Sequence, residues 1–154
     1  MATLNISDLS VGDWVQDNYG NYVKVMGIWQ GCNFNYQVDI LRDGRTGTIV
    51  PCNLHPIPIT VEILEKNEFT RRSSEFPIYE YTTLLGKMLR TTVVSLNYPY
   101  SYIVCKIEDT SKELHEFGRI TVGTSIDRNP IHIHDLQHAM RLAGAAKEFV
   151  IPNK

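Results

Sequence analysis

Short runs of alternating apolar and polar residues, separated by tight-turn residues, fill the first part of the chain and constrain its fold more than any other feature. Alternation with period two is typical of strands with one buried face, and the Asp43-Gly44 pair is a strong hairpin signal. The predicted strands begin at Trp14 and then cover residues 22–28, 36–41 and 46–50. So many short antiparallel strands over so few residues predict a small, strongly bent SH3-like β-barrel.

Three prolines between positions 51 and 58 separate this region from the rest of the chain, because proline ends helices and interrupts central strands. We therefore expect an SH3-like β-barrel over residues 1–58 and an α+β lobe over residues 59–154. Thr60 is a typical N-cap for a short helix. Four further extended segments cover residues 76–82, 88–96, 100–107 and 114–122. They predict a second antiparallel sheet, so the expected fold class is mainly β (α+β).

Residues 131–144 carry the clearest helical pattern in the chain. We expect this C-terminal helix to cover the second sheet. At about 100° per residue, one arc of this helix is apolar and holds Ile133, Leu136, Ala139, Met140 and Ala143. The opposite side, which we expect to face water, holds His134, Gln137, His138 and Arg141. Gly144 stands where a left-handed C-terminal cap belongs, and residues 148–151 predict a short strand behind it.

The linker and the C-terminal helix carry two longer sequence signatures. One reads Pro-Ile-Pro-Ile-Thr-Val-Glu-Ile-Leu-Glu-Lys-Asn-Glu-Phe from Pro56, and the other reads Ile-His-Ile-His-Asp-Leu-Gln-His-Ala-Met-Arg-Leu-Ala-Gly from Ile131. Together they resemble a family of small uncharacterised proteins encoded by gut bacteria and their phages, although His138 stands where that family commonly has Asn. The resemblance implies this architecture and a mobile-element origin, and it supplies no catalytic residue.

Charge and cysteine content narrow the classes of function. The formal net charge is −2, and residues 1–60 contain five acids against three bases, so binding to nucleic acid is possible but not favoured. No apolar run is long enough to cross a membrane, and the N-terminus lacks a basic region followed by a hydrophobic core. The three cysteines have no paired spacing. We therefore expect a cytoplasmic protein without membrane contact, disulfides or a zinc knuckle.

The pattern His-x-His-x₃-His, formed by His132, His134 and His138, is the one candidate metal cluster. It places two imidazoles one helical turn apart with a third just before the helix, an arrangement that can hold zinc and leaves a metal-dependent hydrolase as an alternative, although the metallo-hydrolase pattern His-x-His-x-Asp-His is not met. Arg141 projects between the helical histidines and no nearby Cys or Glu completes the set, so a polar edge without a cofactor is favoured. No nucleophile elbow, phosphate loop or dinucleotide fingerprint is found, so we expect a non-enzymatic protein.

Aromatic residues in the N-terminal region suggest how such a protein would work. The barrel interior can be filled by Val15, Val23, Val25, Ile40 and Ile49, which leaves more large rings than the interior can hold. Surplus exposed aromatic area often marks an interaction surface. We expect this surface to include Trp14, Tyr22, Trp29 and Tyr36. The sequence thus predicts a small accessory protein of a phage or mobile element that binds a protein or peptide, with a nucleic-acid-binding adaptor as an alternative.

Overall fold

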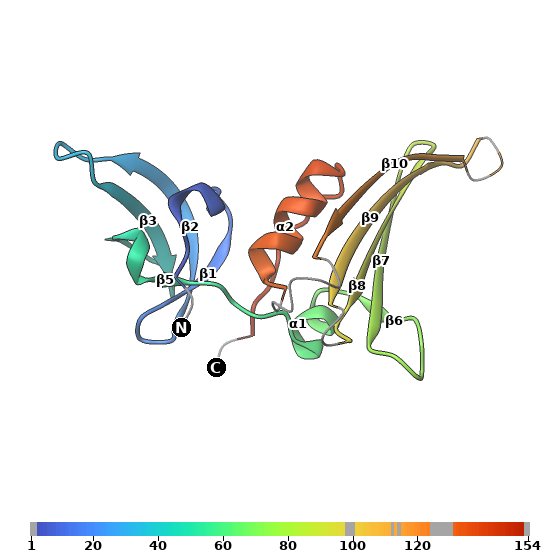
Figure 1. The fold of residues 1–154 in the computed structure, drawn as a ribbon, viewed down its shortest axis with the longest axis horizontal. Coiled ribbons are helices and arrows are strands. Elements are labelled where there is room, and N and C mark those ends of the chain that lie inside the picture. Colours follow the sequence, from blue (N-terminus) through green and yellow to red (C-terminus); the bar gives the residue numbers. More distant parts are fainter. Residues whose placement is uncertain (1–2, 98–100, 112, 114, 124–130, 153–154) are drawn as a thin grey trace. The chain divides into compact units, whose positions relative to one another are not determined.

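The computed structural model describes residues 3–97, 101–111, 113, 115–123 and 131–152. Within them, the chain is mainly β and contains two antiparallel sheets of five strands each and two α-helices (Figure 1). The chain divides into two compact units, Met1–Ile57 and Pro58–Pro152, each with its own sheet. The predicted fold class, mainly β with antiparallel sheets, is therefore confirmed.

One antiparallel sheet, ordered β4-β3-β2-β1-β5, forms the N-terminal unit. Its strands are β1 (Trp14–Asp17), β2 (Tyr22–Gln30), β3 (Tyr36–Arg42), β4 (Arg45–Ile49) and β5 (Leu54–His55). Short 3-10 helices at Ile6–Asp8 and Pro51–Asn53 precede β1 and β5. Among the described residues, β4 and β5 are the two edges and do not pair with each other. The described strands form no closed barrel, so the predicted SH3-like barrel is not confirmed.

The hairpin of β3 and β4 is closed by the expected two-residue turn. Asp43 has a φ of 48° and Gly44 a φ of 76°, and positive φ at both central residues is what a type I′ turn requires. Glycine adopts this conformation without steric cost, and aspartate tolerates it better than most residues do. The strand pairing then starts directly at Arg42 and Arg45, as the sequence predicts.

The core of the N-terminal unit lies on one face of its sheet. Val15 of β1 pairs with Val23 of β2, and both side chains are fully buried, each stabilising the fold by roughly 1.5–2 kcal/mol. The register shifts between Val25 and Gly27, and this β-bulge bends β2 and returns Ile28 to the core face. The other core residues are Leu4, Leu9, Val25, Val38 and Leu54, with Ile6, Ile40 and Ile49 packed against them.

The C-terminal unit holds the second sheet, ordered β10-β9-β8-β7-β6 and antiparallel throughout. Its elements are α1 (Val61–Lys66), β6 (Thr70–Arg71), β7 (Ile78–Leu85), β8 (Met88–Ser95), β9 (Tyr102–Asp109), β10 (His115–Val122) and α2 (Ile133–Leu142). The four long strands match the predicted segments to within a few residues. The turn predicted after Asn97 falls on residues 98–100, which lie outside the described residues.

The helix α1 begins as its sequence indicates. The Thr60 hydroxyl accepts a hydrogen bond from the backbone N–H of Ile63 at 3.3 Å, which confirms the predicted N-cap. Ile63 and Leu64 are buried, and the helix ends at Asn67. A short amphipathic helix of this kind depends on its buried face rather than on intrinsic propensity.

The strand predicted at residues 148–151 is wrong. The backbone N–H of Val150 donates to Asn67 Oδ1 at 2.8 Å, and Asn67 Nδ2 donates to the Val150 carbonyl at 2.8 Å. A buried side-chain amide therefore supplies both hydrogen bonds that a neighbouring strand would have supplied. Phe149 and Ile151 are buried, so the apolar alternation that suggested a strand reflects packing without a backbone ladder.

The helix α2 packs on β9 and β10 of the second sheet (Figure 1). All five residues of its predicted apolar arc are buried. At its C-terminal end, Gly144 has a φ of 68°, which confirms the predicted left-handed cap, and Arg90 Nε donates to the Ala143 carbonyl at 2.8 Å. The expectation that His134 and Gln137 face water is wrong, because both are buried. Helical periodicity locates apolar residues, but it does not show which polar residues find hydrogen-bond partners inside the fold.

Candidate functional site

The structure brings three of the four predicted contact aromatics to one face of the N-terminal sheet. By strand pairing, Trp14, Tyr22 and Trp29 lie opposite the buried valine core, and we call these three residues the outer aromatic face. Tyr36 is half exposed but stands two residues before the buried Val38, so it lies on the core face beyond the end of the core. The structure does not bring Tyr36 onto the outer aromatic face.

The bulge in β2 decides the position of Trp29. Side chains alternate between the faces of a strand, so Trp29 would share the core face with Val23 and Val25 if β2 were regular. The extra residue at Met26 reverses this relation and turns Trp29 outward. Trp29 as a residue consequently remains 47% exposed.

One hydrogen bond holds the Trp29 ring in place, and a second holds the carboxylate that accepts it. Its Nε1–H donates to Asp39 Oδ1 at 3.2 Å, and the Thr48 hydroxyl donates to the same oxygen at 2.9 Å. Gly27 lies beside this carboxylate, where a Cβ would stand 3.4 Å from Asp39 Oδ2. Strands β2, β3 and β4 thus contribute together to fixing a tryptophan whose ring still reaches solvent.

Phe34, in the connection between β2 and β3, is a candidate contact residue that sequence reasoning missed. The residue is 82% exposed and its φ is 58°, a conformation that bulky residues rarely adopt. The Phe34 N–H donates to the Gly31 carbonyl at 3.1 Å, and Gln30 Nε2 donates to the Phe34 carbonyl at 3.1 Å. The signal in the sequence was a phenylalanine inside a turn, where polar residues are the norm.

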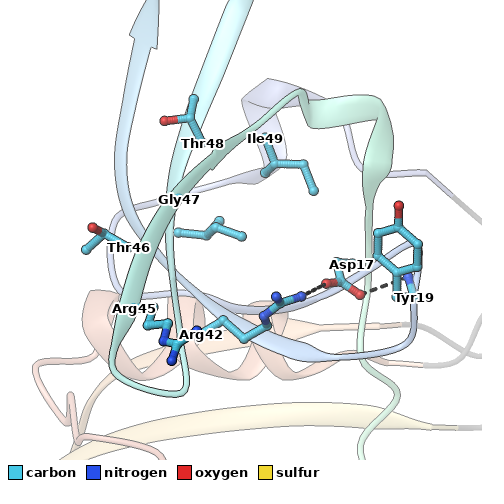
Figure 2. Close-up of a pocket in the computed structure, with 9 residues that line it drawn as sticks. Asp17, Tyr19, Arg42, Arg45, Thr46, Gly47, Thr48 and Ile49 are labelled. Carbon is cyan, nitrogen blue, oxygen red and sulfur yellow. Dashed lines mark hydrogen bonds and ion pairs between the residues drawn. The ribbon is translucent and has the colours of Figure 1, made fainter.

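A hollow of about 200 Å³ lies on the N-terminal unit along the edge strand β4 (Figure 2). Its lining consists of Asp17, Tyr19, Ile40, Arg42, Arg45, Thr46, Gly47, Thr48 and Ile49. Arg42 Nη1 lies 3.3 Å from Asp17 Oδ2, and the exposed Arg45 adds a second guanidinium. Guanidinium, hydroxyl and aliphatic groups together suit a ligand with an anionic end and an apolar part.

Asp17, which lines this hollow, stabilises the turn between β1 and β2. Its carboxylate accepts hydrogen bonds from the backbone N–H groups of Tyr19 and Asn21, both at 2.9 Å, and so closes the turn between β1 and β2. Burial raises the pKa of Asp17, but these hydrogen bonds, the Asn21 amide and the charge of Arg42 outweigh burial and leave the pKa below its ordinary value. The carboxylate is therefore ionised and engaged, and it is unsuited to act as a general acid or base.

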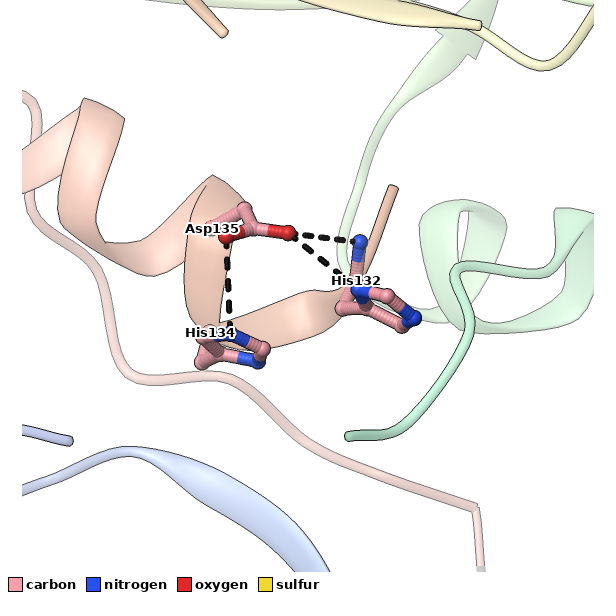
Figure 3. Close-up of side chains that lie close together, drawn as sticks. All are labelled: His132, His134 and Asp135. Atoms are coloured by element: carbon pink, nitrogen blue, oxygen red, sulfur yellow. Dashed lines mark hydrogen bonds and ion pairs between the residues drawn. The ribbon is translucent and has the colours of Figure 1, made fainter. Parts of the chain in front are cut away.

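The structure brings together two of the three histidines predicted as metal ligands, and an aspartate takes the place of the third. His132, His134 and Asp135 each offer one ligand atom, and these atoms all lie within 4.8 Å of one another (Figure 3). His132 Nδ1 lies 3.4 Å from Asp135 Oδ2, and His134 Nε2 lies 3.4 Å from Asp135 Oδ1. The predicted third histidine, His138, stands edge-on to the His134 ring with the ring centroids 6.0 Å apart. The converging set is therefore two histidines and a carboxylate.

Asp135 also caps the helix α2. Its Oδ2 accepts a hydrogen bond from the His132 backbone N–H at 3.0 Å, as a capping box requires. Burial raises the pKa of Asp135, but the hydrogen bonds from His132 and the charges of His134 and His132 outweigh burial and lower the pKa below its ordinary value. The carboxylate is thus ionised near neutral pH, between two imidazole rings.

Comparisons with protein-family models, curated proteins and solved structures found no match for this chain. The resemblance to a family of small proteins encoded by gut bacteria and their phages therefore stays a prediction. In the part of the chain that the structure describes, no helix is long and apolar enough to cross a membrane.

Proposed function

We propose that this chain is a small binding protein whose outer aromatic face holds a protein or peptide partner, with Trp29 as the central contact residue. The observation that carries the proposal is a tryptophan 47% exposed whose indole N–H is nevertheless hydrogen-bonded to Asp39. An exposed ring already held in one orientation loses little conformational entropy on binding, and tryptophan is a common anchor of interfaces. Trp14 and Tyr22 extend the same face, and Phe34 adds an exposed ring at the hairpin end.

The N-terminal unit fits this role as an SH3-like module whose sheet stays open between β4 and β5. The strand order β4-β3-β2-β1-β5, the 3-10 helix Pro51–Asn53 between β4 and β5, and the bend in β2 support this assignment. SH3-like folds bind extended peptides in grooves lined by aromatic residues. The likeness supports a class of ligand only, since function depends on the particular side chains that a fold carries.

Charge favours a protein over a nucleic acid as the partner. Residues 1–60 hold five acids and three bases, whereas nucleic-acid binders carry a basic surface that replaces phosphate counterions. Asp39 beside Trp29 and Lys24 opposite Trp14 give the outer aromatic face one charge of each sign, so a partner segment with apolar side chains is the best fit.

The exposed free thiols of Cys32 and Cys52 suit a reducing compartment. Together with the resemblance at Pro56 and Ile131, they support an accessory protein of a phage or mobile element that acts in the cytoplasm of its host and binds without catalysing a reaction.

The proposal is tested by measuring the affinity of the chain for a partner captured from its host. Trp29→Ala should weaken binding by about 2 kcal/mol, or about thirtyfold, because it removes the central anchor. Phe76→Ala is the matched control, since Phe76 is 48% exposed but lies in the C-terminal unit. This control should leave the affinity unchanged, and neither variant should shift the urea unfolding midpoint by much.

Two results would contradict the proposal. If Trp29→Ala costs roughly 3 kcal/mol or more of folding stability, the ring is part of the core and the proposed surface is wrong. If the captured partner is nucleic acid, held with a steep dependence on salt, the chain is a nucleic-acid-binding adaptor instead.

A further inference from the structure

The cluster of His132, His134 and Asp135 has a geometry that the binding function of the N-terminal unit does not use. Asp135 lies between the two imidazoles and turns one carboxylate oxygen toward each, at 3.4 Å in both cases (Figure 3). The two rings are nearly parallel, with an interplanar angle of 12° and centroids 5.6 Å apart. The three side chains therefore converge on one small volume.

This arrangement is close to the one that a tetrahedral metal centre needs. Zinc binds imidazole nitrogen and carboxylate oxygen at about 2.0–2.1 Å, so its ligand atoms stand roughly 3.3 Å from one another. His132 Nδ1 and His134 Nε2 each lie 3.4 Å from Asp135, but from different carboxylate oxygens. One ligand atom of each residue lies within 4.8 Å of the other two. Binding of one zinc ion therefore requires the three ligand atoms to draw together from separations of up to 4.8 Å to about 3.3 Å.

The surroundings also suit a metal with one open coordination position. His134 is buried and His132 is largely buried, which fixes both rings, while Asp135 remains partly open to solvent. The charge of the helix N-terminus opposes a cation here, and this effect amounts to about fivefold in affinity at an exposed site and about thirtyfold at most when the site is partly buried. It is small beside the contribution of three ligand bonds.

We propose that His132, His134 and Asp135 form a binding site for a divalent transition metal of the zinc class, with a fourth position open to water or to another ligand. Two histidines and one carboxylate are a donor set that zinc accepts in proteins. His138, the third histidine of the sequence pattern, is not assigned as a ligand, because the ligand atoms that lie within 4.8 Å of one another belong to His132, His134 and Asp135.

The test is a titration of the full-length, chelator-treated protein with zinc chloride by calorimetry, together with cobalt(II) absorption spectroscopy. One zinc ion should bind per chain with micromolar affinity or better, and cobalt should give the intense visible bands of tetrahedral coordination. His132→Ala and Asp135→Asn should each weaken binding by at least about tenfold. The asparagine can still accept the His132 backbone hydrogen bond, so the helix cap survives in that variant.

His138→Ala is the control and should bind zinc as the wild type does. Equal loss in His138→Ala would overturn the assigned ligand set. Absence of zinc and cobalt binding in folded wild-type protein would show that the cluster serves only to cap α2, and variants at His132 and Asp135 would then change thermal stability alone. The titration requires no partner, so its outcome is separate from that of the proposed binding function.

Discussion

Replacement of Asn67 tests which interactions attach the segment around Val150 to the rest of the C-terminal unit. The buried Asn67 amide makes three hydrogen bonds, each 2.8 Å long, one to Ile63 and two to Val150. The partners in the last segment lie 83 residues away in the chain. Asn67→Ala removes all three bonds and leaves the Val150 N–H and carbonyl without this partner.

The expected cost follows from these bonds. A buried hydrogen bond contributes about 1 kcal/mol net, so Asn67→Ala should lower the free energy of unfolding of the C-terminal unit by about 3 kcal/mol. For a unit of this size that loss corresponds to roughly 12–24 °C in Tm. Asn33→Ala, at an exposed asparagine in the N-terminal unit, is the matched control and should stay within about 0.5 kcal/mol of the wild type.

The assay is thermal and urea unfolding followed by circular dichroism, with hydrogen exchange at Val150 as a local probe. Asn67→Ala should also speed exchange of the Val150 amide, because its acceptor is gone. A loss below about 1 kcal/mol would refute the reasoning, since burial of Phe149 and Ile151 alone would then hold the segment.

Three further predictions concern backbone, thiol and acid chemistry. Gly123→Ala should cost about 2–3 kcal/mol in urea unfolding, because its φ is 81° and a Cβ would lie 2.8 Å from a backbone oxygen. Gly44→Ala, with a φ of 76° but open space around it, should cost only about 1 kcal/mol. Burial raises the pKa of Cys105, so a thiol reagent should modify two cysteines rapidly and Cys105 only after unfolding. The pKa of Asp17 is lowered in the fold, so its stabilising contribution is present above the unfolded value of 3.8 and is lost as the pH falls through the folded pKa. Acid titration of Asp17→Asn should show a flatter fall in stability than the wild type between the unfolded value of 3.8 and the lower folded pKa.

Much of the fold could be predicted because its determinants are local. Alternating runs with Asp43-Gly44 between them specify a hairpin, Thr60 specifies a helix start, and Gly144 specifies a helix end. Each of these signals depends on residues a few positions apart. Local structure at all three was therefore readable from the sequence.

The candidate sites were less predictable because they depend on register and on distant contacts. A single extra residue in β2 places Trp29 on the outer face, and no sequence pattern predicted that bulge. The cap of α2 turns Asp135 toward His132 and His134, whereas the sequence spacing suggested His138 as the third ligand. The amide of Asn67 replaces a strand partner from 83 residues away, which only the folded chain reveals.

Site-specific photo-crosslinking in host cells tests the central proposal, partner binding by the N-terminal aromatic residues, most directly. In one variant benzoylphenylalanine would replace Phe34, a residue that is 82% exposed. In a matched variant it would replace Phe76, a residue that is 48% exposed. The proposed function predicts a discrete protein adduct from position 34 that position 76 does not give, and that disappears when Trp29→Ala is added. No adduct at position 34, or the same adducts from both positions, would contradict it.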